Sequence, residues 1–462
     1  MVVGIAFYDV KGSADIILLA MNLERQIEQY LPQPVLELVK DISGQATKLG
    51  QRVYLVGGVV RDLLLGYPNF DLDLVVEGDA VKLAQQVGET GQAKLLAHHR
   101  FGTAKLGYEN FTLDLATARK ETYARPGALP EVTAGTLKDD LIRRDFSINA
   151  MAISLAAKGY GELIDPYQGR NDLEHRLIRI LHPRSFSDDA TRILRGVRYE
   201  QRLGFEFEAQ TAQLLKQYIP MLDSISGDRI RHELELILKE EQPELAIQRL
   251  SELGVLARIA PSLKGDGWIA DKFDKARRLK KTNQLPSLHF CLLVYSLSET
   301  ALEQLLSRLN IQAKLSRAML DTLHLKTKLP LLDRPSLKPS EIYHLLREYE
   351  PLAIQANAIA SESPTARRFL RLFLTKLRYV RTVLDGEELK KFGISAGPEM
   401  GKILQALHKA RLNGEVRTRA DEEKLALSLK AINLHADPVK LPGSDRRSTS
   451  GPCGTQSEGH SE

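Results

Sequence analysis

The sequence predicts an α+β protein in which a mixed sheet with helices is followed by an all-helical region. Between residues 51 and 160, short β-rich runs alternate with short amphipathic segments, which is the pattern of strands and helices in one compact domain. After residue 161 the chain is Leu-rich with a helical period, and Pro and Gly mark the joints. Because 462 residues exceed what one ordinary core accommodates, more than one domain is expected.

Composition narrows the class of protein without naming a partner. The 43% hydrophobic and 27% charged content is ordinary for a globular chain. A formal net charge of +5 is mild over this length, so it permits nucleic acid as a partner without arguing for it. The two cysteines, Cys291 and Cys453, give neither a disulfide framework nor a zinc spacing, which suits a cytoplasmic location. No signal peptide and no membrane partner are expected.

Five segments follow from these patterns. They are an N-terminal extension with an amphipathic helix (1–50), a mixed α/β domain (51–160), a first helical region (161–260), a longer helical region (261–436), and a Gly/Ser-rich tail expected to be disordered (437–462).

Within the mixed α/β domain the elements alternate in order. Strands are expected at 53–58, 70–76, 101–108, 111–118 and 148–156, with helices at 59–66 and 79–90. The segment 118–141 holds Pro126, Gly127, Pro130 and Gly135, so it is expected to be a mobile loop rather than a strand.

The stretch "YLVGGVVRDLLLGYPNFDLDLVV" carries the strongest chemical signal. Asp71 and Asp73 lie two apart on a strand and therefore project on the same face, while Leu72 turns into the core. Two carboxylates held this close repel each other, and Mg²⁺ bound to hard oxygen ligands is the usual remedy. An edge strand with two solvent-facing acids is the alternative.

The residues before this strand fit an anion. Gly57 and Gly58 let the backbone approach a bulky phosphate, and the following helix offers its N-terminal amides. Arg61 lies in the first turns of that helix, where a cation opposes the helix dipole, so a phosphate is its expected partner. A third acid, Asp114 in "FTLDLATAR", is expected either to activate a hydroxyl or to complete metal coordination, unless it is a strand-end residue facing water.

Two further clusters are basic. In "LIRRDFSINAMA", Arg144 is expected to clamp a triphosphate, although a solvated face is the alternative. In "SFSDDATRILRGVRYEQRLGF", four arginines form one stripe on a helix and lack nearby acidic partners: Arg192, Arg195, Arg198 and Arg202. Asp189 and Arg192 lie one turn apart and can offer an acceptor and a donor fork to a base edge, or Asp189 can simply cap the helix.

These clusters, in this order and spacing, resemble the class II tRNA nucleotidyltransferases and bacterial poly(A) polymerases. The shared motifs are GGxVRD with DxD (57–73), RRDFSINAMA (143–152), DPYQG (165–169) and an acidic-acidic-x-x-Arg element (188–192). One departure is that the usual Glu-Asp pair reads Asp188-Asp189. No His-Asp phosphohydrolase signature follows downstream.

The resemblance implies a nucleotidyltransferase head followed by an all-α neck, body and tail. It implies an enzyme that extends the 3′ end of tRNA without a template, using ATP, CTP or both, with two Mg²⁺ ions on Asp71 and Asp73. Gly57, Gly58, Arg61, Arg144, Arg195 and Arg198 would hold the nucleotide, and Asp189 with Arg192 would select the base.

The resemblance leaves several activities open. The loop at 118–141 appears full length and is worded most like variants that add the terminal A, so addition of A to tRNA ending in -CC is expected. A CC-adding enzyme, a poly(A) polymerase acting on other RNA 3′ ends, and an RNA-binding module with an inactive head are the alternatives.

Overall fold

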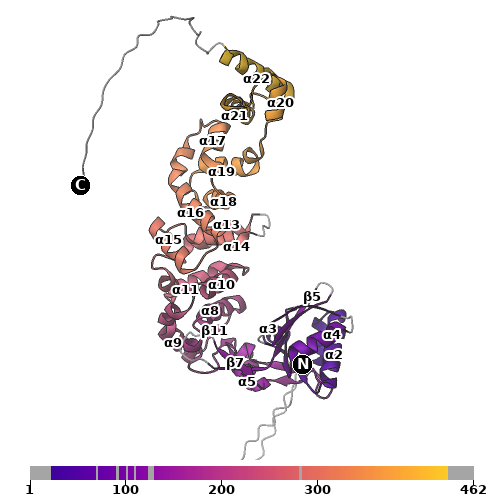
Figure 1. Cartoon of the computed structure of the whole chain (residues 1–462). Coiled ribbons are helices and arrows are strands. Elements are labelled where there is room, and N and C mark those ends of the chain that lie inside the picture. Colours follow the sequence, from indigo (N-terminus) through magenta and orange to yellow (C-terminus); the bar gives the residue numbers. More distant parts are fainter. Residues whose placement is uncertain are drawn as a thin grey trace, which may run out of the picture. The chain divides into compact units, whose positions relative to one another are not determined.

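The computed structural model describes residues 22–68, 71–89, 93–99, 102–108, 111–122, 130–279 and 284–434 (Figure 1). The predicted disordered tail at 437–462 lies outside these residues. The chain divides into two compact units. The first comprises the described residues up to Lys328 together with Tyr349–Glu362, and the second comprises Leu329–Glu348 with the described residues from Ser363 onward.

A mixed sheet forms the start of the first unit. Its strands are β1 (Arg52–Val56), β2 (Leu72–Glu77), β3 (Lys94–His99), β4 (Thr103–Tyr108), β5 (Phe111–Thr117), β8 (Ala152–Ser154) and β9 (Leu163–Ile164), in the order β3-β4-β5-β2-β1-β8-β9. Strands β2 and β5 pair in parallel, and the other neighbours pair antiparallel. Five of these strands match predicted ones, whereas β3 and β9 were not predicted. The predicted α+β class is confirmed.

The two faces of the sheet are covered differently. Helices α2 (Gln33–Lys48), α3 (Gly58–Leu65) and α4 (Ala80–Glu89) pack on the face that carries Leu72 and Leu74, with α1 (Glu24–Tyr30) beside α3. The sequence assigned residues 1–50 to an extension, but α2 buries its apolar side in this same core. The opposite face is covered by the short helix α5 (Leu137–Ile142). Because α5 covers only part of it, polar side chains on this face remain accessible.

The expectation of a loop at 118–141 is wrong for most of the segment. Strands β6 (Arg119–Thr122) and β7 (Glu131–Ala134) pair as an antiparallel ribbon, and α5 follows with a capping box made by Thr136 and Asp139. Pro126 and Gly127, on which the expectation rested, lie between the strands and outside the described residues. The flanking residues pair with each other over a separation that local turn signals do not reveal.

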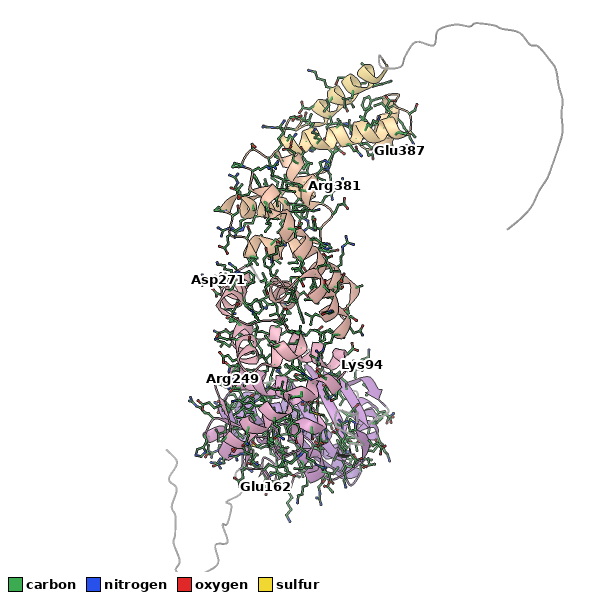
Figure 2. All side chains as sticks on the ribbon, turned by 90° about the vertical axis from the view of Figure 1, so that its left-hand side faces the viewer. Lys94, Glu162, Arg249, Asp271, Arg381 and Glu387 are labelled. Carbon is green, nitrogen blue, oxygen red and sulfur yellow. The ribbon has the colours of Figure 1, made fainter. Side chains whose placement is uncertain are left out.

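Helices make up the remainder of the first unit. They are α6 (Gly169–Glu174), α7 (Ser185–Asp188), α8 (Thr191–Leu203), α9 (Ala209–Tyr218), α10 (Gly227–Leu238), α11 (Pro243–Glu252), α12 (Val255–Ile259), α13 (Gly267–Arg277), α14 (Leu285–Leu293), α15 (Glu299–Arg308), α16 (Ala313–Lys328) and α18 (Pro351–Ala360). A two-residue ladder of β10 (Leu177–Ile178) with β11 (Glu206–Phe207) interrupts them. Arg249 of α11, labelled in Figure 2, donates to Glu200 of α8 at 2.9 Å and ties these two helices together.

The second unit is also helical. It contains α17 (Pro339–Leu346), α19 (Pro364–Thr375), α20 (Gly386–Lys391), α21 (Pro398–Asn413) and α22 (Arg419–Leu434). The last three helices share a small core around Leu389, Ile403 and Leu407. Within it the buried Glu422 accepts from Arg411 and from the backbone N–H groups of Val383 and Leu384. Among all the described helices of the chain, none is long and apolar enough to cross a membrane.

Two glycines of the first unit allow a matched test of this packing. A Cβ on Gly169 would lie 2.3 Å from the carbonyl oxygen of Ser147, and backbone cannot yield as a side chain can. We expect Gly169→Ala to lower the free energy of unfolding by about 1–3 kcal/mol. The control, Gly44→Ala, fills open space on the exposed side of α2 and should stabilise the protein by roughly 0.5–1 kcal/mol. Thermal and urea unfolding measure both, and equal effects would contradict the packing described.

Candidate active site

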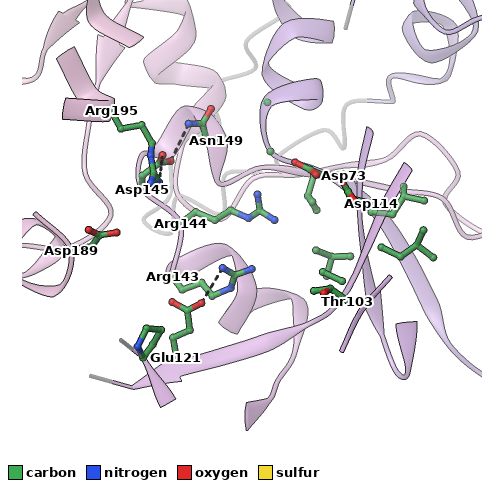
Figure 3. Close-up of a pocket in the computed structure, with 18 of the residues that line it drawn as sticks. Asp73, Thr103, Asp114, Glu121, Arg143, Arg144, Asp145, Asn149, Asp189 and Arg195 are labelled. Atoms are coloured by element: carbon green, nitrogen blue, oxygen red, sulfur yellow. Dashed lines mark hydrogen bonds and ion pairs between the residues drawn. The ribbon is translucent and has the colours of Figure 1, made fainter. Parts of the chain in front are cut away.

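A pocket of about 660 Å³ opens between the partly covered face of the sheet and helix α8 (Figure 3). Its charged lining residues are Asp73, Lys105, Asp114, Glu121, Arg143, Arg144, Asp145, Asp189, Arg192, Arg195 and Arg229. In Figure 3, Asp73 and Asp114 lie on the sheet side, Asp189 and Arg195 lie on the opposite side, and Arg144 projects between them. This volume is suited to one nucleotide.

The acidic wall of the pocket is a row across three strands. Asp73 of β2 lies directly beside Asp114 of β5 in the parallel ladder, and Asp114 lies opposite Lys105 of β4. The Lys105 ammonium donates to Asp114 at 2.8 Å. Asp114 therefore already has a cationic partner, whereas no ion pair to Asp73 is found within the part of the chain that the structure describes.

Asp73 has an unusual affinity for protons. Burial by the surrounding protein raises the pKa of Asp73 to about 6, although the nearby Arg144 opposes the shift, and the carboxylates of Asp71 and Asp114 raise it further. The cause is an excess of negative charge in a poorly hydrated place. A divalent cation would relieve that excess, so the donor set fits Mg²⁺. No group of three or more metal-ligating side chains in metal-binding geometry occurs in the described residues.

Gly57 lets the basic and acidic walls approach each other. It adopts a φ of +80°, which favours glycine, and a Cβ there would lie 2.8 Å from Nη1 of Arg144 and 3.6 Å from Oδ2 of Asp73. The Arg144 guanidinium is oriented by Asp140 at 3.0 Å, and the same buried carboxylate holds Arg143 at 2.6 Å. Gly58 begins α3 and also lines the pocket. The glycines thus bring backbone and Arg144 to the carboxylates.

Asp145 connects the head to the helices that follow. Its carboxylate accepts from the Phe146 N–H at 2.9 Å, from Asn149 at 3.0 Å and from Arg195 of α8 at 3.2 Å. Arg195 in turn donates to Glu233 of α10 at 2.9 Å. Burial alone would raise the pKa of Asp145, but the Arg195 guanidinium and the Asn149 amide hold it below its usual range.

The arginine stripe on α8 has acidic partners, contrary to the expectation from sequence. Arg195 pairs with Asp145 and Glu233, and both Arg198 and Arg202 face Glu240, at 3.2 and 4.0 Å. These acids come from the head and from the region of α10, 38 to 50 residues away from Arg195 and Arg198 in sequence. Tertiary folding therefore supplies the charges that the local sequence does not.

Asp189 and Arg192 both line the pocket, but protein groups hold each of them. Arg192 is only 4% exposed and donates to Ser185 Oγ at 2.6 Å and to the carbonyl oxygen of Arg143 at 2.6 Å. Asp189 precedes α8, and its Oδ1 accepts from the Thr191 N–H and pairs with Arg229 at 2.8 Å. The pair is thus oriented in advance, and Asp189 also performs the capping role that was its alternative.

Two candidate residues, and part of a third, lie elsewhere. Arg61 is 3% exposed, donates to Asp62 and to Asn149, both at 2.8 Å, and lies 5.3 Å from the Tyr199 ring centroid, outside the pocket. Arg198 also contacts Tyr199 and does not line the pocket. Asp71 borders a neighbouring cavity rather than this one. The phosphate role predicted for Arg61 has no support in this arrangement, because its donors are used inside the protein.

Sequence reasoning missed several residues of the pocket. Lys105 alternates with the buried Ala104 and Leu106 along β4, and this alternation could have indicated its face. Arg229 lies on α10, 40 positions after Asp189, and no local pattern reveals their pairing.

Carboxylates facing an arginine-rich pocket of nucleotide size define an enzyme that transfers a phosphoryl or nucleotidyl group. Comparison with known proteins refines this class. The Poly A polymerase head domain matches residues 53–179, and a probable RNA and SrmB-binding site of polymerase A matches residues 204–266.

Curated relatives agree. The chain is 35% identical to an A-adding tRNA nucleotidyltransferase of Halalkalibacterium halodurans, covering 88% of this chain and 95% of that protein. It is 36% identical to an A-adding tRNA nucleotidyltransferase of Geobacter sulfurreducens, covering 91% of this chain but only 50% of the relative. A CC-adding tRNA nucleotidyltransferase of Deinococcus radiodurans is 34% identical over 81% of this chain and 88% of its own length.

Solved structures agree as well. A CCA-adding enzyme in an apo form superimposes with a TM-score of 0.75 and 30% identity, covering 88% of this chain and 99% of that one. The Thermotoga maritima CCA-adding enzyme complexed with tRNA gives a TM-score of 0.69 at 28% identity, covering 89% and 99%. The chain belongs to the tRNA nucleotidyltransferase and poly(A) polymerase family, so it is an enzyme of the nucleotidyltransferase class. The predicted family is confirmed.

The Asp145 network predicts a pH-dependent stability. Asp145→Asn keeps the shape of the side chain but removes the charge that faces Arg195, so the free energy of unfolding should fall by about 3–5 kcal/mol at pH 7. Because the folded pKa of Asp145 is lowered, its contribution is complete above the ordinary Asp pKa of about 3.9 and is lost as pH falls toward the folded value. Urea unfolding at pH 7 and near pH 3.5 should therefore show a smaller difference at acid pH. A difference independent of pH would contradict the proposed charge pairing.

Proposed function

We propose that this protein adds the terminal adenosine to tRNA ending in -CC, using ATP and releasing pyrophosphate. The observation that carries the proposal is the pocket itself, in which Asp73 and Asp114 face Arg144 and the pair Asp189 and Arg192 across a space of about 660 Å³. A cytoplasmic location, where tRNA is processed, belongs to the same proposal.

Several observations support ATP as the nucleotide and the -CC end as its acceptor. Relatives named as A-adding enzymes match 78% to 91% of the chain, and that of Halalkalibacterium halodurans is covered almost completely. A related CCA-adding enzyme has been solved in complex with ATP, at 29% identity. Addition of CC is the main alternative, because the Deinococcus relative is nearly as similar and a related structure holds CTP.

The chemistry follows from the charges of the pocket. The 3′-hydroxyl oxygen of the RNA forms a bond to the α-phosphorus of ATP, the bond from that phosphorus to the bridging oxygen of the β-phosphate breaks, and the hydroxyl proton passes to solvent. Arg144, fixed by Asp140, lies where it can stabilise negative charge on the triphosphate. Asp140 keeps the guanidinium in one orientation, so little reorganisation is needed when charge develops.

Asp71 and Asp73 are the residues proposed to hold Mg²⁺. When bound, this ion would polarise the α-phosphate and lower the pKa of the attacking hydroxyl. The raised pKa of Asp73 is consistent with a place built for a cation. Asp114 is paired with Lys105, so we assign it to orienting this wall of the pocket and to keeping its charge balanced.

The base would be selected at the opposite wall. Arg192 retains its Nε–H group, and Asp189 retains Oδ2, after the hydrogen bonds found among the described residues are counted. An acceptor and a donor held in fixed positions can distinguish the Watson–Crick edges of adenine and cytosine. The hydrogen bonds to Ser185 and to the Arg143 carbonyl provide that fixed position for Arg192.

Removal of a carboxylate tests the reaction centre. Asp73→Asn and Asp71→Asn should each lower the rate of AMP transfer by about 10²-fold or more, because loss of a metal ligand costs several kcal/mol. The matched control is Glu303→Gln on the exposed side of α15, which should retain the wild-type rate. The rate is measured in single turnovers on tRNA-CC, with circular dichroism to verify folding. A rate above about a tenth of wild type in Asp73→Asn would be incompatible with the assigned role.

Specificity is tested with purified tRNA ending in -N, -C or -CC and one nucleotide at a time. We expect ATP alone to extend tRNA-CC by one residue, with CTP and GTP much less effective on that end. Efficient addition of CTP to the shorter ends without extension of tRNA-CC by ATP would identify a CC-adding enzyme. Extension of unstructured RNA by many adenosines would identify a poly(A) polymerase.

A further inference from the structure

Asp71 and Asp73 are two residues apart, yet they border different cavities. Asp73 lines the pocket described above, whereas Asp71 lines a second pocket of about 840 Å³. The second pocket lies where the end of α3 and the residues after it meet α8 and the segment around Arg176. A transfer reaction brings two substrates to one set of carboxylates, so two cavities that share the DxD segment require an explanation.

The second pocket combines cations with flat rings. Tyr67 is 58% exposed, which is unusual for a large side chain that lines a cavity, and Tyr199 lies deeper. Arg176 and Arg202 lie on the other side, with the apolar side chains of Leu203 and Phe205 between them. Exposed aromatic rings next to arginines are the means by which proteins hold single-stranded nucleic acid, since bases stack on the rings and phosphates pair with the guanidinium groups.

Arg176 stands out within this lining. Its φ of +57° lies in the left-handed region, although it is not a glycine, and its backbone is fixed there by hydrogen bonds with Leu173 and Glu206. Across the described residues its guanidinium has neither a hydrogen bond nor an ion pair, unlike Arg61 and Arg198 in the same pocket. A strained backbone that presents an unpaired cation at a cavity is consistent with a binding role.

We propose that the second pocket is the acceptor subsite, which holds the 3′-terminal nucleoside of the RNA that is to be extended. Tyr67 stacks on the terminal base, Arg176 pairs with the phosphodiester that precedes it, and the terminal ribose lies toward Asp71. The ATP occupies the other pocket, so the two substrates meet at the two ends of the DxD pair. This inference rests on the proposed nucleotidyl transfer and adds where the nucleophile binds.

The charges favour an RNA end over a second free nucleotide. The triphosphate pocket has six cationic side chains in its lining, including Arg144 and Lys105 beside the carboxylates. In the second pocket Arg61 is used by Asp62 and Asn149, and Arg198 by Glu240, which leaves Arg176 and the weakly paired Arg202 for a ligand. One or two phosphodiesters match this charge, whereas a triphosphate would not be neutralised.

The test separates binding of the acceptor from binding of ATP. The full-length chain is assayed with ATP on an acceptor-stem minihelix ending in -CC, so that contacts to the rest of a tRNA do not mask a local effect. Tyr67→Ala should raise the KM for the minihelix about 10-fold or more, as expected for loss of base stacking, and leave the KM for ATP within about 2-fold. Tyr67→Phe should restore the wild-type KM because it keeps the ring.

Arg176 is tested with a residue that tolerates its backbone. Arg176→Asn removes the charge while allowing a positive φ, and it should raise the KM for the minihelix and reduce its dependence on salt concentration. The matched controls are Arg170→Asn, in the nearby helix α6 but outside the pocket, and Tyr379→Ala, another exposed tyrosine, which should leave the KM unchanged.

The outcomes distinguish the two levels of inference. If Tyr67→Ala and Arg176→Asn leave the KM for the minihelix unchanged, or raise the KM for ATP equally, the second pocket is not the acceptor subsite. If the unsubstituted chain transfers no nucleotide to any RNA 3′ end, the proposed function itself is wrong. Normal ATP binding by both variants, measured by equilibrium dialysis, together with a raised KM for the minihelix, would support the assignment.

Discussion

The buried carboxylate of Asp145 is the interaction on which the arrangement of the active site depends. It accepts from the backbone of the head and from Asn149, and it pairs with Arg195 on the helix that forms the far wall of the pocket. Asn149 also accepts from Arg61 at the start of α3. One carboxylate thus links the glycine turn, the sheet and α8, and a change at any of these positions would shift the others.

The pocket reflects a balance between repulsion and pairing. Asp73 and Asp114 are adjacent across the parallel ladder, and Lys105 neutralises Asp114 while Asp73 keeps a raised pKa. The two functions of a carboxylate, to bind a cation and to hold structure, are therefore divided between neighbours of the same residue type. On the basic side, Arg144 is oriented by Asp140 and Arg192 by Ser185, so these cations are positioned before a ligand arrives.

The buried Arg61 shows how a motif can have a structural role. Its donors are used by Asp62 and Asn149, and its guanidinium lies against the Tyr199 ring, which also contacts Arg198. This cluster separates the two cavities that border Asp73 and Asp71. An arginine that appears in a phosphate-binding motif can thus act by fixing the wall between two substrate sites.

The sequence by itself determined the α+β class, five of the strands, the two helices between them and the clustering of acids and arginines. These features depend on local periodicity and on motif spacing, which are readable within one segment. Only the tertiary structure decided the partners: Glu233 for Arg195, Arg229 for Asp189, Lys105 for Asp114, and separate cavities for Asp71 and Asp73. It also decided that residues 119–122 and 131–134 form a ribbon. The physical reason is the same in each case: pairing between side chains or strands far apart in the chain depends on how elements pack, and packing leaves no periodic trace in either partner's own sequence.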